Sequence, residues 1–269
     1  MHVGEAINLA VWVIRTNKLR AFFTVLGTVV GVTFLIAVVT LISGMDGYVR
    51  EDLAGKVYGF NTVMVRRVPS VEMDMGADAR RALARRPLLT LEDAEWLEGE
   101  ISTAGVLAVS VEGSGKIAGP GRRAMENARI VGSSATFFRI RDMVVDYGRV
   151  FSEQEAERGV PVVVIGKDVA DKLFNGRNPL EQSIRIQRFP YRVVGVLEKQ
   201  APLFGASMDN VVIAPIRSRV SSAVGTPGVV GEIMYKVPHA DLLGPAIAEL
   251  QELMRIRHGL RAEQLNDFS

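Results

Sequence analysis

The sequence predicts a strand-rich α+β protein of two interleaved lobes, preceded by one membrane-spanning helix. Two observations support this fold class. An unbroken apolar run lies near the amino terminus, and after it short β-rich segments alternate with segments of helical periodicity. The roughly 220 residues beyond the run are enough to fill one hydrophobic core or two small ones.

The apolar run is residues 21–42, AFFTVLGTVVGVTFLIAVVTLI, and it contains no charged residue, proline, asparagine or glutamine. As a helix it spans roughly 33 Å, against about 30 Å of membrane hydrocarbon. A cleaved signal peptide is disfavoured because its apolar core is only about 7 to 15 residues long. Residues 41–46 also offer no small-x-small cleavage site. We therefore expect a membrane protein with a transmembrane helix over 21–44.

Basic residues crowd the amino-terminal side of this helix: Arg15, Lys18 and Arg20. The stretch beyond the helix, GMDGYVRED at 44–52, has mixed charge. This asymmetry favours a cytoplasmic amino terminus and a main domain outside the cytoplasm. Residues 1–20 then form a cytoplasmic segment, either an amphipathic helix on the membrane surface or a polar extension of the spanning helix.

Within the helix, Gly27 and Gly31 form a G-x-x-x-G step. Glycines at this spacing let a second helix approach closely. The pair is either a helix-packing face or a coincidence in a lipid-facing helix that tolerates glycine.

The external region opens with a β-α-β unit. A strand is expected over 61–68 and another over 106–111, and the helix between them has Thr90 as its N-cap and Asp93 at its third position. The last predicted helix, 240–258, has an apolar stripe and is closed by Gly259. The other predicted elements are a helix over 167–174 and strands over 128–132, 160–166, 184–187, 192–197, 210–214 and 232–237.

Composition and motifs argue against several function classes. The chain has 32 basic and 30 acidic side chains and no basic block, so nucleic-acid binding is not expected. It has no cysteine and only three dispersed histidines, which gives no zinc-ligand cluster. Residues 164–168, VIGKD, lack the earlier glycine and the Ser or Thr of a phosphate-binding loop. We expect no enzymatic activity, metal or cofactor in this chain.

One apolar loop is a candidate partner contact. It consists of Pro202, Leu203 and Phe204, flanked by polar residues. The alternative is a buried loop that plugs the domain.

These patterns resemble the MacB/FtsX-like permease subunits of ABC transporters over nearly the whole chain. The order and spacing of the family's elements carry the resemblance. In chain order, they are N-K-x-R at 17–20, L-G-x-x-x-G at 26–31, G-R-x-F at 148–151, a strand and helix ending in L-F at 162–174, a hairpin at 178–196, a strand closed by proline at 210–215, and the domain's end at 257–258 and 267–268.

The resemblance implies an extracytoplasmic MacB-type core domain over 45–269. This domain has a ferredoxin-like β-α-β lobe, with a second, β-rich lobe inserted at approximately 113–205. The resemblance also implies a bacterial plasma (inner) membrane location and partners: the bilayer, a second permease copy or paralogue, and a cytoplasmic ABC ATPase that holds the ATP and magnesium. A periplasmic adaptor is a further partner that the resemblance allows.

The function that the resemblance implies is mechanotransmission, in which ATP hydrolysis by a separate or fused ATPase moves the external domain for export or transmembrane signalling. The rival hypothesis is a single-pass membrane-anchored binding or adaptor protein that works without an ATPase.

Two departures limit the resemblance. The sequence ends where the second of the family's four helices is expected, so it is a fragment, a split gene product, or a chain completed by another chain. Lipoprotein-extracting relatives also carry a protruding loop in the hairpin, whereas here Arg188-Phe189-Pro190 alone turns the chain. This favours export of, or signalling about, peptides, drugs or cell-wall components.

Overall fold

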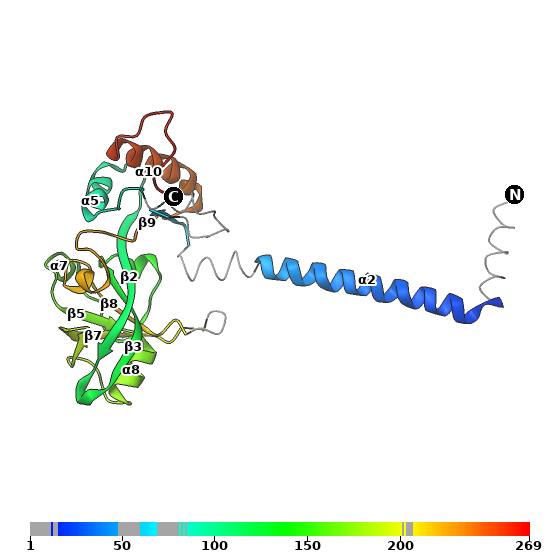
Figure 1. The fold of residues 1–269 in the computed structure, drawn as a ribbon, viewed down its shortest axis with the longest axis horizontal. Coiled ribbons are helices and arrows are strands. Elements are labelled where there is room, and N and C mark those ends of the chain that lie inside the picture. The colour runs from blue at the N-terminus through cyan, green and yellow to red at the C-terminus, as the bar shows by residue number, and fades with distance from the viewer. Residues whose placement is uncertain are drawn as a thin grey trace. The chain divides into compact units, whose positions relative to one another are not determined.

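The structure is a computed structural model that describes residues 12, 16–47, 60–68, 81, 83, 85–200, 202 and 207–269 (Figure 1). The chain forms two compact units, Met1–Gly55 and Lys56–Ser269. The first contains helix α2, and the second contains every described strand.

Helix α2 runs from Lys18 to Gly47. Its stretch Lys18–Thr40 is long and apolar enough to cross a membrane, and none of that stretch is buried within the described structure. A core helix of a soluble protein would bury such side chains, whereas here Phe34 is 70% exposed. The hydroxyl of Thr28 donates to the carbonyl of Thr24 at 2.9 Å, so this polar group is satisfied without water.

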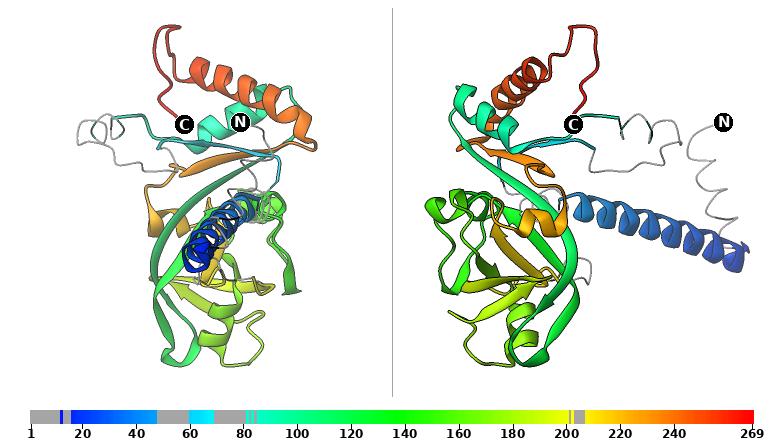
Figure 2. Two further views of the ribbon diagram at one scale, coloured as in Figure 1. Left: turned by 90° about the vertical axis from the view of Figure 1, so that its right-hand side faces the viewer. Right: turned by 60° about the vertical axis from the view of Figure 1, so that its left-hand side comes forward.

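The ferredoxin-like lobe is built on strands β1, β9 and β2. Strand β9 lies between β1 and β2 and is antiparallel to both, so β1 and β2 run parallel. Ser269 exchanges two backbone hydrogen bonds, of 2.8 and 2.7 Å, with Arg66 at the end of β1. The order is therefore Ser269, β1, β9, β2, with α5 and α10 over one face of the strands (Figure 2). The bounds are Thr62–Arg66 (β1), Leu91–Glu100 (α5), Val106–Ala118 (β2), Glu232–Lys236 (β9) and Leu243–Arg257 (α10).

The second lobe is a closed barrel. Its strands pair in the cycle β2, β3, β8, β5, β7, β6 and back to β2, and β4 adds to the outside of β7. Closure leaves these strands without a free edge. The bounds are Ala124–Ser133 (β3), Val145–Gly148 (β4), Val162–Ile165 (β5), Ser183–Ile186 (β6), Phe189–Leu197 (β7) and Val211–Pro215 (β8).

Short helices connect the strands of the barrel lobe. They are the 3-10 helix η2 (Pro120–Arg122) and the α-helices α6 (Phe137–Ile140), α7 (Glu153–Glu157), α8 (Lys167–Phe174) and α9 (Val220–Val224). A second 3-10 helix, η3 (Ala240–Leu242), leads into α10.

Strand β2 joins the two lobes, because it runs through both of them (Figures 1 and 2). Val109 packs in the core under α5 and α10, and Ile117 packs inside the barrel. Ala108, the neighbour of Val109, packs with Phe137 and Phe138 in a third core, which also contains Met234 of β9. The lobes therefore share a strand and a core.

Several predicted elements are confirmed. Thr90 and Asp93 form the reciprocal N-cap of α5, and the stripe of α10 buries Ala246, Leu250 and Met254.

Other predictions were wrong in detail. The strand predicted to end at 111 continues to Ala118, because its polar, glycine-containing second half pairs with β3. The hairpin turns at Gln187-Arg188 instead of Arg188-Phe189-Pro190, since Ile186 pairs with Phe189 and the φ of Gln187 is +53°. Elements β4, α6 and α9 were not predicted, because four or five residues carry too little periodicity.

Some expectations are not tested by the structure. Most of the segment 1–20, including Arg15, lies outside the described residues, as do Leu203 and Phe204. The inserted segment 113–205 stays a prediction, and β8, which closes the barrel, lies beyond it.

Candidate functional site

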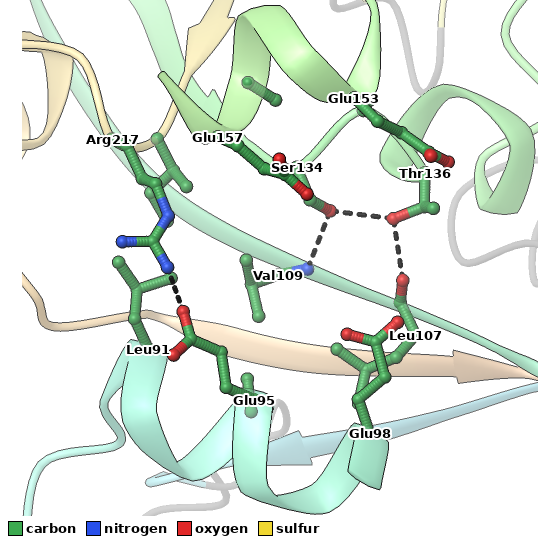
Figure 3. A pocket seen from close by; sticks show the side chains of 14 residues that line it. Leu91, Glu95, Glu98, Leu107, Val109, Ser134, Thr136, Glu153, Glu157 and Arg217 are labelled. Atoms are coloured by element: carbon green, nitrogen blue, oxygen red, sulfur yellow. Dashed lines mark hydrogen bonds and ion pairs between the residues drawn. The ribbon is translucent and has the colours of Figure 1, made fainter. Parts of the chain in front are cut away.

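A cleft of about 580 Å³ separates α5 of the ferredoxin-like lobe from α7 of the barrel lobe (Figure 3). The two helices form its walls, and β2 with the turn after β3 forms its floor. The lining residues are Leu91, Ala94, Glu95, Glu98, Leu107, Val109, Ser134, Ala135, Thr136, Glu153, Ala156, Glu157, Ile216 and Arg217.

Hydroxyl groups fix the floor of the cleft. The backbone N–H of Val109 donates to Oγ of Ser134 at 3.2 Å, and Oγ1 of Thr136 donates to the carbonyl of Leu107 at 2.6 Å. The two hydroxyl oxygens are 2.9 Å apart. These bonds hold the turn after β3 against the edge of β2 (Figure 3), so the barrel lobe has a defined position under the ferredoxin-like lobe.

The walls of the cleft are acidic. Glu95 and Glu98 come from α5, and Glu153 and Glu157 come from α7. Arg217 forms an ion pair with Glu95 across the cleft. Burial, followed by the negative charges of Glu153, Glu95 and Glu157, raises the pKa of Glu98. The like charges of the two lobes thus act on each other through the cleft.

The G-R-x-F element positions the α7 wall. Arg149 makes two hydrogen bonds to the carboxylate of Glu155, of 2.7 and 2.8 Å. Ser152 caps α7 in a reciprocal capping box with the same Glu155. Phe151 is buried and stacks edge-on against Phe138 at 5.0 Å. The G-R-x-F motif therefore anchors α7, the helix that carries Glu153 and Glu157.

Replacing Glu155 with glutamine is expected to lower the free energy of unfolding by about 1 to 2 kcal/mol at pH 7. The hydrogen bonds from Arg149 lower the pKa of Glu155 from 4.5 to about 2, with burial opposing them and Ser152 assisting. Because the pKa is depressed on folding, this stabilisation is complete above about pH 4.5 and is lost as the pH falls toward 2. The magnitude is discounted because Arg149 is 53% exposed.

Urea unfolding of the full chain in detergent at pH 7 and at pH 3 measures this effect. The difference between wild type and E155Q should shrink at pH 3. The matched control is Glu153→Gln on the same helix, which removes a carboxylate without an ion pair in the described chain and should change stability by no more than about 0.5 kcal/mol. Equal losses of stability in E155Q and E153Q would contradict the assignment of this stabilisation to the hydrogen bonds between Arg149 and Glu155.

A second cluster lies on the opposite side of β2, beside a cavity of about 370 Å³. Glu232 of β9 accepts from Arg66 Nε at 2.8 Å, from Arg141 at 2.7 Å and from Ser110 at 3.0 Å. The Glu232 side chain is only 8% exposed. Burial alone would raise its pKa, but the charges of Arg141 and Arg66 outweigh burial and lower it. Since Arg141 follows α6, the cluster ties the barrel lobe to the ferredoxin-like lobe.

The structure places some of the sequence-predicted site residues. Lys18 and Arg20 are exposed in the first turn of α2. A Cβ added to Gly27 or Gly31 would meet nothing within 4 Å, so both positions on the helix surface are open within the described chain. Pro202 is described and exposed. Pro202 does not line the cleft.

The cleft was not predicted from the sequence, and no role was predicted for Glu95, Glu98, Glu153 or Glu157. The available signal was the spacing of three or four residues between glutamates in two separate helices, which places each pair on one helix face. Nothing in the sequence indicated that the two faces oppose each other.

The described residues hold no group of three His, Asp or Glu side chains placed to hold a metal ion. The cleft instead has carboxylates on two walls, with a floor between them that combines the apolar side chains of Leu107 and Val109 with the hydroxyls of Ser134 and Thr136.

A family model described as the MacB-like periplasmic core domain matches residues 21–253. Among curated relatives, the macrolide export ATP-binding/permease protein MacB of Neisseria gonorrhoeae (strain ATCC 700825 / FA 1090) is 28% identical over 257 residues, covering 95% of this chain and 38% of that protein. The protein of the same name from Chlorobaculum tepidum is 26% identical over 260 residues, with the same two coverages. The chain thus spans 38% of the length of these relatives.

Two solved structures share the fold. The periplasmic region of MacB from Actinobacillus actinomycetemcomitans matches with a TM-score of 0.63 and 22% identity, over 81% of this chain and 91% of that chain. The extracellular domain of the noncanonic ABC-type transporter YknZ from Gram-positive bacteria matches with a TM-score of 0.58 and 22% identity, over 75% and 96%. The family match covers most of the sequence and the fold agrees with it, so the chain belongs to the MacB-like periplasmic core domain family of ABC transporter permeases.

Proposed function

We propose that this chain is part of the permease subunit of a MacB/FtsX-type ABC transporter, in which ATP hydrolysis on a cytoplasmic ATPase moves the extracytoplasmic domain. The observation that carries the proposal is the extent of the family match, which begins at residue 21, inside helix α2, and continues through both lobes. The match thus includes both the helix and the two-lobed domain. Mechanical coupling across a membrane needs both, because the helix would pass motion from the cytoplasmic side to the domain.

In this proposal the amino terminus is cytoplasmic and the domain lies outside the plasma membrane. The exposed Lys18 and Arg20 in the first turn of α2 support this orientation. ATP and magnesium are held by the ATPase, and this chain contributes no catalytic residue.

The strand and the core that the two lobes share support transmission of motion between them. Because the lobes share strand β2 and a core that contains Ala108, Phe137 and Met234, a displacement of one lobe carries the other with it. The proposed output is export or transmembrane signalling. The curated relatives are named for macrolide export, which supports export of drug-like molecules or peptides over lipoprotein release.

The experiment that tests the proposal measures domain motion in the complete transporter. The sequence has no cysteine, so a cysteine introduced at exposed Arg177 is the one site for a spin label within these 269 residues, and any cysteines in the rest of the transporter are replaced by serine. We expect the distance distribution between two copies in lipid nanodiscs to change on adding ATP. The change should be absent when the ATPase cannot bind ATP. A monomer that co-purifies with no ATPase would overturn the proposal and favour the adaptor alternative.

Helix packing gives a separate prediction. Replacing Gly27 and Gly31 together with leucine should lower the dimer fraction roughly fivefold, because bulky side chains would block close approach of a second helix. A Cβ added at either position meets nothing within 4 Å in the described chain, so we expect its own fold to be retained. Val29→Leu, which adds bulk away from the glycine face, is the matched control. Subunit counting by single-molecule photobleaching in nanodiscs measures the dimer fraction, and unchanged assembly in the double variant would refute a packing role.

A further inference from the structure

The cavity beside the Glu232 cluster has the size of a ligand site. Its volume, about 370 Å³, falls in the range of roughly 300 to 1,000 Å³ that is typical of small-molecule sites. Both lobes line it, because Arg66 and Glu232 come from β1 and β9, whereas Arg129 comes from β3 and Arg141 follows α6. A molecule held there would contact both lobes at once.

Part of the cavity wall is both polar and buried. The side chains of Arg141 and Glu232 are only 10% and 8% exposed, and Ser110, which donates to Glu232, is fully buried. Ser133 lies directly opposite Ser110 on β3, so the two side chains share one face of the sheet. The buried Oγ of Ser133 has no hydrogen-bond partner among the described residues. A buried hydroxyl without a partner is unusual and indicates a missing polar group close by.

The electrostatic environment favours a negative charge. Arg129 is half-buried and, within the described part of the chain, forms no ion pair. Burial would raise the pKa of Glu232, yet the charges of Arg141 and Arg66 lower it. The cavity therefore holds one carboxylate in its charged form already. The other lining carboxylate, Glu112, is exposed, so water screens its charge.

The same cavity also offers apolar contacts. Phe137, Met143 and Met208 line it, and Phe137 is almost fully buried. Methionine side chains adapt to irregular shapes. An apolar body of a ligand would lose contact with water against these side chains, which favours binding.

We propose that this cavity binds a small organic carboxylate. The ligand's carboxylate lies at the guanidinium of Arg129, and its apolar body lies against Phe137 and Met208. A guanidinium matches the two oxygens of a carboxylate with parallel N–H donors. A single negative charge is the match for Arg129, because no carboxylate of the described chain neutralises it.

This inference goes beyond the proposed function. Binding in the cavity requires neither an ATPase nor domain motion, so it is tested on the purified chain alone. Failure of binding would leave the proposed coupling untouched, and failure of coupling would leave the site untouched.

The test uses two water-soluble probes of closely similar shape that differ in charge. They are 3-phenylpropionate and its neutral amide, 3-phenylpropionamide, titrated calorimetrically into the full chain in nanodiscs of zwitterionic lipid, with empty nanodiscs as the reference. We expect saturable binding of the carboxylate, weakened by added salt, and at least tenfold weaker binding of the amide. Equal affinity for the two probes, or no binding of the carboxylate, would overturn the proposal.

Variants locate the site. Arg129→Gln should weaken binding of 3-phenylpropionate about tenfold, because it removes the charged partner of the ligand. Glu112→Gln should tighten binding about twofold, since it removes a screened like charge. The matched control is Arg185→Gln, an exposed arginine on β6 that does not line the cavity, and it should leave the affinity unchanged. Wild-type affinity in R129Q, or equal losses in R129Q and R185Q, would refute the site.

Discussion

Replacing Glu232 with glutamine should lower the free energy of unfolding by about 3 kcal/mol. The Glu232 carboxylate is the shared partner of Arg66 and Arg141, whose side chains are only 21% and 10% exposed. Without the negative charge, two guanidinium groups lie close together in a poorly solvated site. Removing one member of a buried ionic cluster is costly for this reason, even where the intact cluster adds little net stability.

The measurement is urea unfolding of the full chain in detergent, followed by the fluorescence of Trp96 in a Trp12→Phe background, since the chain has two tryptophans. Trp96 lies on α5, in the lobe that contains Glu232. The matched control is Glu112→Gln, an exposed glutamate on the neighbouring strand β2, with an expected change within about 0.5 kcal/mol. If E232Q and E112Q are equally stable, the cluster does not join the lobes energetically.

Replacing Gly195 with alanine is expected to be still more damaging, with a loss of about 4 kcal/mol or more. Gly195 on β7 pairs in register with Gly148 on β4. A Cβ at Gly195 would overlap the backbone carbonyl of Arg149, and backbone atoms held in a sheet cannot move aside as a flexible side chain can. The strand would have to separate from β4, which would also release the arginine that anchors α7.

The same unfolding assay checks this prediction, with Gly99→Ala as its control. Gly99 lies within α5, and an added Cβ there meets nothing within 4 Å. Because alanine is the better helix former, G99A should raise stability by up to about 1 kcal/mol. The two glycine-to-alanine changes thus have opposite expected signs. A neutral G195A would show that the β4 and β7 backbones are not held in contact.

The motif glycines show how far sequence reasoning extended. The G-R-x-F element at 148–151 and the hairpin at 178–196 were recognised as separate family features. The structure shows that their glycines face each other across one strand pair. The sequence shows a glycine at each position. The need for glycine arises from the close approach of the β4 and β7 backbones, which exists only after the two strands have paired.

Local features could be predicted from the sequence. The apolar run of α2, the Thr90 and Asp93 cap, and the stripe of α10 each depend on residues within one or a few helical turns, so their patterns are complete in a short window. The order of the motifs was also sufficient to identify the family. These features determined an α+β domain behind a helix that is long and apolar enough to cross a membrane.

Only the tertiary structure decided how distant segments meet. Barrel closure depends on Ile117 meeting Ile186, the ionic cluster joins Arg66 to Glu232 across 166 positions, and Glu95 meets Arg217 across 122. Chain closure over such separations is set by the packing of the whole domain, and no short window of sequence contains it. The sequence by itself therefore determined the family and the longer helices, whereas short elements such as β4, α6 and α9, the closed barrel and the acidic cleft were decided by tertiary packing.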